Sequence, residues 1–487
     1  MIRLSDRLRD LCAEAARRLP SDDAQTAAGL AARLDGPLRI AIAGRVKAGK
    51  STLLNALVGE RLAPTDAGEC TRTVTWYRHG DSYEVAALLR DGTTRPLPFD
   101  RSQVALQFDL DGIELDSIER VDVSWPSARL AEITLIDTPG LASLDDRNSS
   151  RSVEFLTPGD GERSTDADAV VYLMRHIHRR DVEFLDAFMD RTVTQASPAN
   201  AVGILSRADE IGGGRLDALQ SAERIAARYR ADPVIKSLCG TVVPVAGLLA
   251  EAGATLRQEE FRDLTLLAKE SDSTLGTLLV TADRFRMAGI GPLTIEKRRH
   301  LLERFGLFGV RFAVDRIRSQ EAADAPELAR SMVAASGVGE LRRLLVDHFL
   351  PRAQTLQGRA VLAGLHALAG KIGGEDAAWL RDEIERIEMT AGELSELRLL
   401  HLAVAEVVGF NDHEIDEVRR LLLRGDLSAR LDRRGAEGDA LSQAALEGVE
   451  RWREKAADPR NDPVTIEACQ LAAQVYERLF ALIAAGE

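Results

Sequence analysis

The residues from Gly44 to Ser51, GRVKAGKS, place glycines, lysine and serine at the spacing typical of a phosphate-binding loop. Gly44 and Gly49 let the backbone curl so that successive N–H groups point at phosphate oxygens, and a helix starting near Lys50 adds its positive end. The Lys50 ammonium can neutralise terminal phosphates, and the Ser51 hydroxyl can ligate Mg²⁺. A chance glycine-rich turn is disfavoured, because an apolar strand precedes the loop and a helical pattern follows it. We predict a nucleotide site whose remaining loop contacts are Val46, Lys47, Ala48 and Thr52.

A second candidate element is ITLIDTPG, residues 133–140, in which a short apolar strand ends in Asp137. The Asp137 carboxylate can hold a water bound to Mg²⁺, and the backbone N–H of Gly140 can lie near the γ-phosphate. An isolated turn is the alternative. Its position after a strand and downstream of the phosphate loop favours a nucleotide role, with Mg²⁺ as the cofactor.

A third candidate element, PTDAGECTRTVTW at residues 64–76, lies between the first two. A threonine here can fold over the nucleotide and ligate Mg²⁺. Spacing alone does not choose among Thr71, Thr73 and Thr75, and each of them also suits a residue entering the next strand.

The identity of the base depends on VGILSRADEIG, residues 202–212. Asp209, just after this strand, can accept hydrogen bonds from the N1–H and 2-amino groups of guanine, a donor pair that adenine lacks, so GTP is the predicted nucleotide. The usual signature has Asn or Thr followed by Lys, where this chain has Ser206 and Arg207. Arg207 can lie over the base with its stem or its planar head. The alternatives are an exposed charged turn, or an ATPase in which Asp209 does not read the base.

The elements around these motifs predict an α/β fold. Short apolar runs alternate with helical patterns from Leu38 to about Gly247, which favours a mainly parallel sheet with helices on both faces. The expected helices are 50–59, 181–193 and 214–230, and the expected strands are 38–43, 74–80, 83–90, 120–125, 133–137, 169–174, 202–206 and 242–246. From Arg257 onward the pattern is helical, and Glu375 to Val407 predicts one long helix of roughly nine turns, which needs bundle partners.

Composition excludes several classes of function. The net charge of −14 over 487 residues argues against nucleic-acid binding, and hence against a ribosome- or RNA-associated GTPase. The four cysteines are scattered, as in reduced cytosolic proteins. The charged N-terminus does not resemble a signal peptide, and no apolar run approaches the roughly 18–20 residues that span a bilayer. We expect a cytoplasmic protein with at most peripheral membrane contact. The pairs His176 and His178, and Asp145 and Asp146, are interpreted as loop residues rather than metal sites.

Together, GRVKAGKSTLLNAL, PTDAGECTRTVTWYRHG, DTPG, SRADEIG and VVPVAGLLA resemble the bacterial dynamin-like GTPases, in particular the isoniazid-inducible protein C type of mycobacteria. The helical half, with LLERFGLFGVRFAV and NDPVTIEACQLAA, is similar as well, so the resemblance covers nearly the whole chain. It implies a GTPase head at residues 37–355, with a nucleotide core (37–250) and a helical extension (251–355). It also implies a helical-bundle stalk formed by residues 356–487 and joined by an N-terminal helix within residues 1–36.

The resemblance further implies that head-to-head dimerisation stimulates hydrolysis. It identifies Thr71 as the switch threonine and VPVAG, around Ala246, as the last guanine-contacting loop. Association with a sister dynamin-like protein, with membrane remodelling under cell-wall stress and with the inner face of the plasma membrane is the expected setting.

Two departures from the family pattern are visible. Eukaryotic dynamins carry glutamine and serine where this loop has Val46 and Lys47. Val46 cannot orient water, so the Thr71 backbone is the substitute we expect, with Lys47 as a stabilising charge in cis or across a dimer. We therefore expect slow hydrolysis. The alternative is a nucleotide-loaded assembly subunit of a sister GTPase. The second departure is the stalk, for which about 130 residues after Arg352 allow only a short four-helix bundle.

Overall fold

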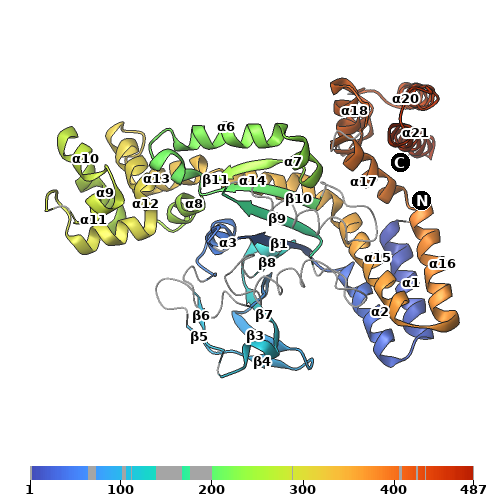
Figure 1. The fold of residues 1–487 in the computed structure, drawn as a ribbon, viewed down its shortest axis with the longest axis horizontal. Coiled ribbons are helices and arrows are strands. Elements are labelled where there is room, and N and C mark those ends of the chain that lie inside the picture. The colour runs from blue at the N-terminus through green and yellow to red at the C-terminus, as the bar shows by residue number, and fades with distance from the viewer. Residues whose placement is uncertain are drawn as a thin grey trace.

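The computed structural model describes residues 3–45, 47–63, 73–100, 106–110, 112–138, 167–175, 200–287, 289–404, 408–423, 426–433 and 435–485. A central sheet lies between a helical lobe on one side and a helical bundle on the other (Figure 1). The predicted combination of an α/β nucleotide fold with an all-helical part is confirmed.

The sheet has nine strands in the order β11-β10-β9-β1-β8-β2-β7-β3-β4. The five strands from β11 to β8 run parallel, whereas β2 is antiparallel to β8 and β3 is antiparallel to both β7 and β4. The main strands are β1 (Leu38–Gly44), β2 (Thr75–His79), β3 (Glu84–Leu89), β7 (Ile118–Trp125), β8 (Ile133–Asp137), β9 (Ala169–Met174), β10 (Ala201–Ser206) and β11 (Val242–Val245).

All the strands expected from the sequence are present. The short strands β4 (Thr94–Pro96), β5 (Phe99–Asp100) and β6 (Gln107–Phe108) were not predicted. They contain only two or three residues each, and β4 and β5 are exposed, so they leave no apolar run in the sequence.

Side-chain alternation along β1 places the sheet between two cores. Ile40 and Ile42 pack with Leu53 and Leu54 of α3 (Lys50–Val58), while Ala41 and Ala43 belong to the core on the other face. That second core includes α6 (Ala218–Ala231) and the helical lobe. Successive residues of a strand point to opposite faces of the sheet, so the strand LRIAIA contributes side chains to both cores. The predicted helices on both faces are thereby confirmed.

The lobe consists of α8 (Gly247–Ala254), α9 (Gln258–Ala268), α10 (Asp272–Leu278), α11 (Ala282–Met287), α12 (Ile295–Arg318) and α13 (Ala325–Ala335), and α7 (Pro233–Leu238) lies beside the sheet. The helix α12 is kinked at Gly306, which adopts a non-helical φ of 63°. Beyond α14 (Val338–Leu344), a wider turn at Leu345–Phe349 and a tighter one at Leu350–Arg352 lead into α15 (Ala353–Lys371).

Both ends of the chain contribute helices to the other side of the molecule. The N-terminal segment forms two helices where we expected one, α1 (Leu4–Arg18) and α2 (Ser21–Arg33), because Leu19 and Pro20 take up extended backbone between them. Both pack on α15, and α1 also contacts α16 (Gly374–Thr390). Their shared core includes Leu8, Leu365 and Ile384.

The prediction of one helix from Glu375 to Val407 was wrong. The helix α16 ends at Thr390, and α17 (Gly392–Val404) begins after Ala391, whose ψ of 104° is extended. A Cβ at position 392 would lie 2.8 Å from the Arg478 guanidinium, so the break brings glycine against the last helix. The remaining helices, α18 (Asp412–Leu423), α19 (Leu427–Arg430), α20 (Asp439–Ala456) and α21 (Pro463–Ala485), share a separate core with α17.

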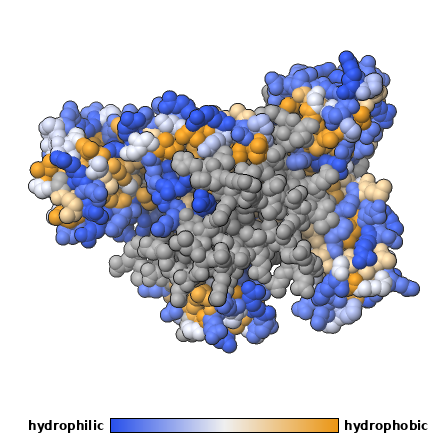
Figure 2. All heavy atoms as spheres, viewed as in Figure 1, coloured by the Kyte–Doolittle hydropathy of each residue, from blue (hydrophilic) through white to orange (hydrophobic). Residues whose placement is uncertain are grey.

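On the face shown in Figure 2, hydrophilic residues cover most of the lobe and the bundle, with apolar residues in small groups between them. None of the helices in the described part of the chain combines the length and the apolar character needed to cross a membrane.

Candidate nucleotide-binding site

The phosphate loop connects β1 to α3, and its glycines are required by the backbone. Gly44 has a φ of 148°, and a Cβ there would lie 2.5 Å from the carbonyl oxygen of Leu173. Gly49, at the start of α3, has a φ of 95° and open space where a Cβ would project. Lys47, also at positive φ (62°), is exposed, whereas Ala48 is buried. The loop therefore presents an open backbone at the N-terminus of a helix, the geometry that binds phosphate.

Lys50 lies across this loop. Its ammonium donates hydrogen bonds to the carbonyl oxygens of Gly44 (3.1 Å) and Arg45 (3.4 Å). Burial lowers the pKa of Lys50, and the nearby Asp137 carboxylate opposes that shift. A phosphate would offer this buried cation a charged partner, which carbonyl oxygens do not provide.

Ser51 and Asp137 meet at the carboxyl end of the parallel strands. The Ser51 hydroxyl donates to Oδ2 of Asp137 at 3.2 Å, and Oδ1 of Asp137 is buried without a hydrogen-bond partner. Burial raises the pKa of Asp137 to about 6, although Lys50 and Ser51 act in the opposite direction. A buried, unpartnered carboxylate oxygen beside a hydroxyl fits Mg²⁺, which takes oxygen ligands, several of them from water and phosphate.

A cavity of about 200 Å³ adjoins the loop. On one side it is bounded by the loop and α3, and on the other by the segments that follow β10 and β11. Its lining includes Ala48, Gly49, Thr52, Leu53, Ser206, Arg207, Asp209, Glu210, Val245, Gly247 and Leu248. Phosphate-side and base-side motifs, more than 150 residues apart in sequence, thus share one pocket.

Asp209 is 6% exposed at the base side of this cavity. Burial raises its pKa to about 6; Glu210 adds to the rise, and Arg207 and Arg175 oppose it. Ser206, at the place of the usual Asn or Thr, donates from its hydroxyl to the Met174 carbonyl at 3.2 Å and so ties β10 to β9.

Arg207 and Arg175 both bind the Glu210 carboxylate at the cavity mouth, Arg207 at 2.6 Å. Arg207 has a φ of 54°, which is uncommon for a residue with a side chain. Glu210 thereby connects the end of β9 to the loop after β10.

Ala246 is fully buried behind the cavity, and its neighbours Val245 and Gly247 line it. The backbone N–H of Ala246 donates to the carbonyl oxygen of Ser336 at 2.9 Å. This bond anchors the loop to the segment before α14.

Several predicted residues cannot be placed. Val46, Thr71 and Gly140 lie outside the described residues, as do His176, His178, Asp145 and Asp146. Of the other two candidate threonines, both buried, Thr75 pairs with Asp137 across the β2–β8 ladder and Thr73 precedes β2. Within the described residues, no group of three or more His, Cys, Asp or Glu side chains could hold a metal by itself.

Sequence reasoning missed the residues that join distant parts of the site. No sequence pattern indicated that Glu210 pairs with Arg175, because the two residues are 35 positions apart. Asn55 could have been noticed as a polar residue within the apolar stretch LLNALV. Its partner Glu251, and Arg61, which binds Glu251, had no comparable signal.

Comparison with known proteins agrees with this geometry. The sequence profile of the dynamin family matches residues 40–187. The chain is 37% identical over 456 residues to isoniazid-induced protein IniC of Mycobacterium tuberculosis, covering 93% of this chain and 92% of that protein. It is 34% identical over 125 residues to a bacterial dynamin-like protein of Nostoc punctiforme, covering 23% of this chain and 18% of that one.

Among solved structures, a chain of an oligomerised bacterial dynamin pair aligns with 99% of this chain and 90% of its own length, at 13% identity and a TM-score of 0.33. The evidence for kinship is therefore the sequence similarity to IniC, which extends over both the nucleotide-binding part and the helices. The chain belongs to the bacterial dynamin-like GTPases of the dynamin family.

Proposed function

We propose that this chain binds GTP with Mg²⁺ in the pocket between the phosphate loop and Asp209, and hydrolyses it slowly. The observation that carries the proposal is that residues of the phosphate loop and residues near Asp209 line one and the same cavity. Ala48, Gly49 and Thr52 line it from the phosphate loop, and Asp209 lines it from the base side.

The proposed roles follow from position and chemistry. The backbone from Gly44 to Gly49 and the Lys50 ammonium hold the phosphates. Ser51 and Asp137 hold Mg²⁺, which when bound neutralises charge on the β- and γ-phosphates. Thr71 and Gly140 complete the γ-phosphate side, and Lys47, exposed on the loop, supplies a further positive charge.

The proposed base contacts are those of Asp209, Arg207 and the loop at Ala246. Asp209 accepts the two N–H donors of guanine, and its burial strengthens these bonds. Arg207 packs over the base from the cavity mouth.

We further propose that nucleotide state controls head-to-head dimerisation or assembly with a sister dynamin-like protein. The basis is membership of a family whose heads pair on nucleotide binding. The same basis supports a peripheral role in membrane remodelling or maintenance under cell-wall stress, carried out from the cytoplasm at the inner face of the plasma membrane.

Val46 favours a second candidate function. An apolar side chain at the place of a water-positioning glutamine suits a subunit that holds nucleotide with little turnover. GTP hydrolysis per molecule, measured over a wide range of protein concentrations with ATP as the control, separates the two. A GTP-specific rate that rises with concentration supports the dimerising GTPase. A flat, near-zero rate with tight GTP binding supports the subunit, and equal use of ATP contradicts both.

A further inference from the structure

A buried polar cluster lies one helical turn behind the nucleotide cavity. Its centre is Asn55 on α3, whose Oδ1 accepts from the backbone N–H groups of Leu62 (2.9 Å) and Ala63 (2.7 Å). Its Nδ2 donates to the Ala63 carbonyl (3.0 Å) and to Oε2 of Glu251 (3.3 Å). Both donors and both acceptor positions of the amide are used, which fixes its orientation.

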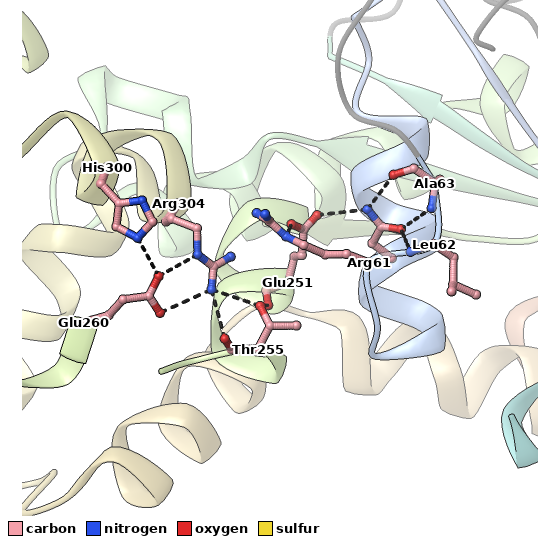
Figure 3. A network of polar contacts seen from close by, with 9 residues as sticks. Arg61, Leu62, Ala63, Glu251, Thr255, Glu260, His300 and Arg304 are labelled. Carbon is pink, nitrogen blue, oxygen red and sulfur yellow. Dashed lines mark hydrogen bonds and ion pairs between the residues drawn. The ribbon is translucent and has the colours of Figure 1, made fainter. Parts of the chain in front are cut away.

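Glu251 connects this cluster to α8. Its side chain is 1% exposed, and its other carboxylate oxygen accepts from Nε of Arg61 at 2.5 Å. Figure 3 shows Glu251 reaching from α8 toward Arg61 and the turn at Leu62 and Ala63. An ion pair with a buried carboxylate and further hydrogen bonds holds its members in one geometry, because losing Arg61 leaves the buried Glu251 charge unpaired.

The two helices joined by this cluster each form part of one wall of the cavity. Thr52 on α3 and Leu248 on α8 line it. Asn55 and Glu251 follow them by three residues each, so each lies on the same face as its wall residue, one turn deeper. The helices also approach closely at Gly247, where a Cβ would lie 3.5 Å from the Thr52 methyl group.

We propose that Glu251 is a positioning residue for nucleotide binding. It holds the base-side wall, α8, against the phosphate-side helix, α3, through Asn55 and Arg61. The spacing of the walls is therefore set before the nucleotide arrives. The inference rests on the proposed function of the pocket and assigns Glu251 no contact with the nucleotide. Since the cluster acts on the walls and not on the reacting phosphate, its loss weakens affinity and leaves turnover at saturating GTP largely unchanged.

The chain contains a matched control for this cluster. Glu260 on α9 is also 1% exposed, and it binds Arg304 (2.7 Å) and His300 (3.0 Å) of α12. Arg304 further donates to the carbonyl oxygen of Thr255, at the end of α8 away from the cavity (Figure 3). The two clusters share their chemistry and burial, but only the Glu251 cluster reaches α3.

The test compares GDP affinity in two pairs of variants. Glu251→Gln keeps the shape and removes the charge, and the double variant Arg61→Leu/Glu251→Leu replaces both partners with apolar residues, which limits the cost to stability. Glu260→Gln and Arg304→Leu/Glu260→Leu are the controls. All are measured below their unfolding temperatures by titration with fluorescent GDP and by GTP turnover.

We expect Kd for GDP to rise about tenfold in both Glu251 variants, the scale of one charge-assisted hydrogen bond, with kcat within about twofold of wild type. The Glu260 variants should stay within about twofold in Kd. Unchanged GDP affinity in the Glu251 variants, an equal loss in the controls, or a loss confined to kcat would overturn the inference while the proposed function stands. A wild-type chain that binds no GDP would overturn the proposed function and this inference with it.

Discussion

The phosphate half and the base half of the proposed nucleotide site are built differently. In the phosphate half, one continuous segment from β1 to α3 supplies the loop, Lys50 and Ser51, and among the described residues Asp137 joins them from another strand, β8. In the base half, Asp209 and Arg207 follow β10, Ala246 follows β11, and Arg175 follows β9.

The difference shows where each half obtains its precision. The geometry of the phosphate half is determined by backbone conformation, namely by glycines at positive φ and by the N-terminus of α3. The geometry of the base half is determined by pairing between side chains, namely by the ion pairs of Glu210 with Arg175 and Arg207 at the half-exposed mouth of the cavity. Such exposed pairs are individually weak. We therefore expect changes in the phosphate half to abolish binding and changes in the base half to alter which base is bound, and how tightly.

The largest expected effect is that of Lys50→Ala. We expect affinity for GTP and GDP to fall by roughly 1000-fold or more, because several charge-assisted bonds to phosphate are lost. The free protein should not unfold more readily, since burial lowers the pKa of Lys50 and makes its charge costly to hold. Isothermal titration and thermal unfolding check the two statements, with Lys371→Ala on the bundle as the control. Tight GTP binding by Lys50→Ala would refute the assignment of the phosphate half.

Asp209→Asn should change the choice of base. We expect roughly 30-fold weaker GTP binding and a preference for xanthosine triphosphate, because an amide can donate to the xanthine oxygen and can accept only one guanine N–H. Competition titrations of the two nucleotides measure it, and Asp217→Asn, an exposed acid on the surface, controls for the change in charge. A variant that loses both nucleotides equally would mean that Asp209 does not read the base.

A third prediction concerns pH. Burial raises the pKa of Asp209 to about 6, and guanine needs the ionised carboxylate. As pH falls below 6 the free protein becomes protonated at Asp209, so GDP affinity should drop by up to about tenfold per pH unit. Titrations from pH 5 to 8 should show this slope in the wild type.

The raised pKa of Asp209 also predicts how the stability of the nucleotide-free chain changes with pH. Because the pKa of Asp209 in the folded state lies above the ordinary aspartate value of 3.8, the folded state binds the proton more tightly than the unfolded state. The contribution of Asp209 to stability is therefore present below about pH 4 and lost as pH rises to 6. Asp209→Asn should remove the Asp209 contribution from both pH profiles and leave that of Asp137, whose pKa burial also raises to about 6. A wild-type affinity that is constant down to pH 5 would contradict the account.

The smallest expected effect is that of Glu210→Gln. Glu210 helps to raise the pKa of Asp209, so its removal should move the midpoint of the GDP affinity profile downward. Arg207 and Arg175 also lose their shared partner, which should change GDP affinity by no more than about threefold. The same pH titration measures both. A midpoint that rises would show that Glu210 acts mainly by holding Arg207 and Arg175 near Asp209, whose pKa they lower.

The parts of the site that local sequence determines could be predicted. The loop from Gly44 to Ser51 forms within one strand–helix connection, and apolar runs marked the central strands. Chain breaks set by packing could not be predicted. The end of α16 at Ala391 depends on the approach of Gly392 to Arg478, which is distant in sequence.

Contacts between distant segments were also beyond sequence reasoning. Asn55 and Glu251 are 196 positions apart, and nothing in either local pattern indicates the other. The roles assigned to Thr71, Val46 and Gly140 stay predictions.

The most direct test of the central claim is a crystal structure of the chain with Mg²⁺ and a non-hydrolysable GTP analogue. The account predicts phosphates along the Gly44–Ser51 backbone, Mg²⁺ beside the Ser51 hydroxyl, and guanine N1–H within hydrogen-bond distance of the Asp209 carboxylate. A nucleotide held elsewhere, or a base turned away from Asp209 with the phosphates in place, would contradict it.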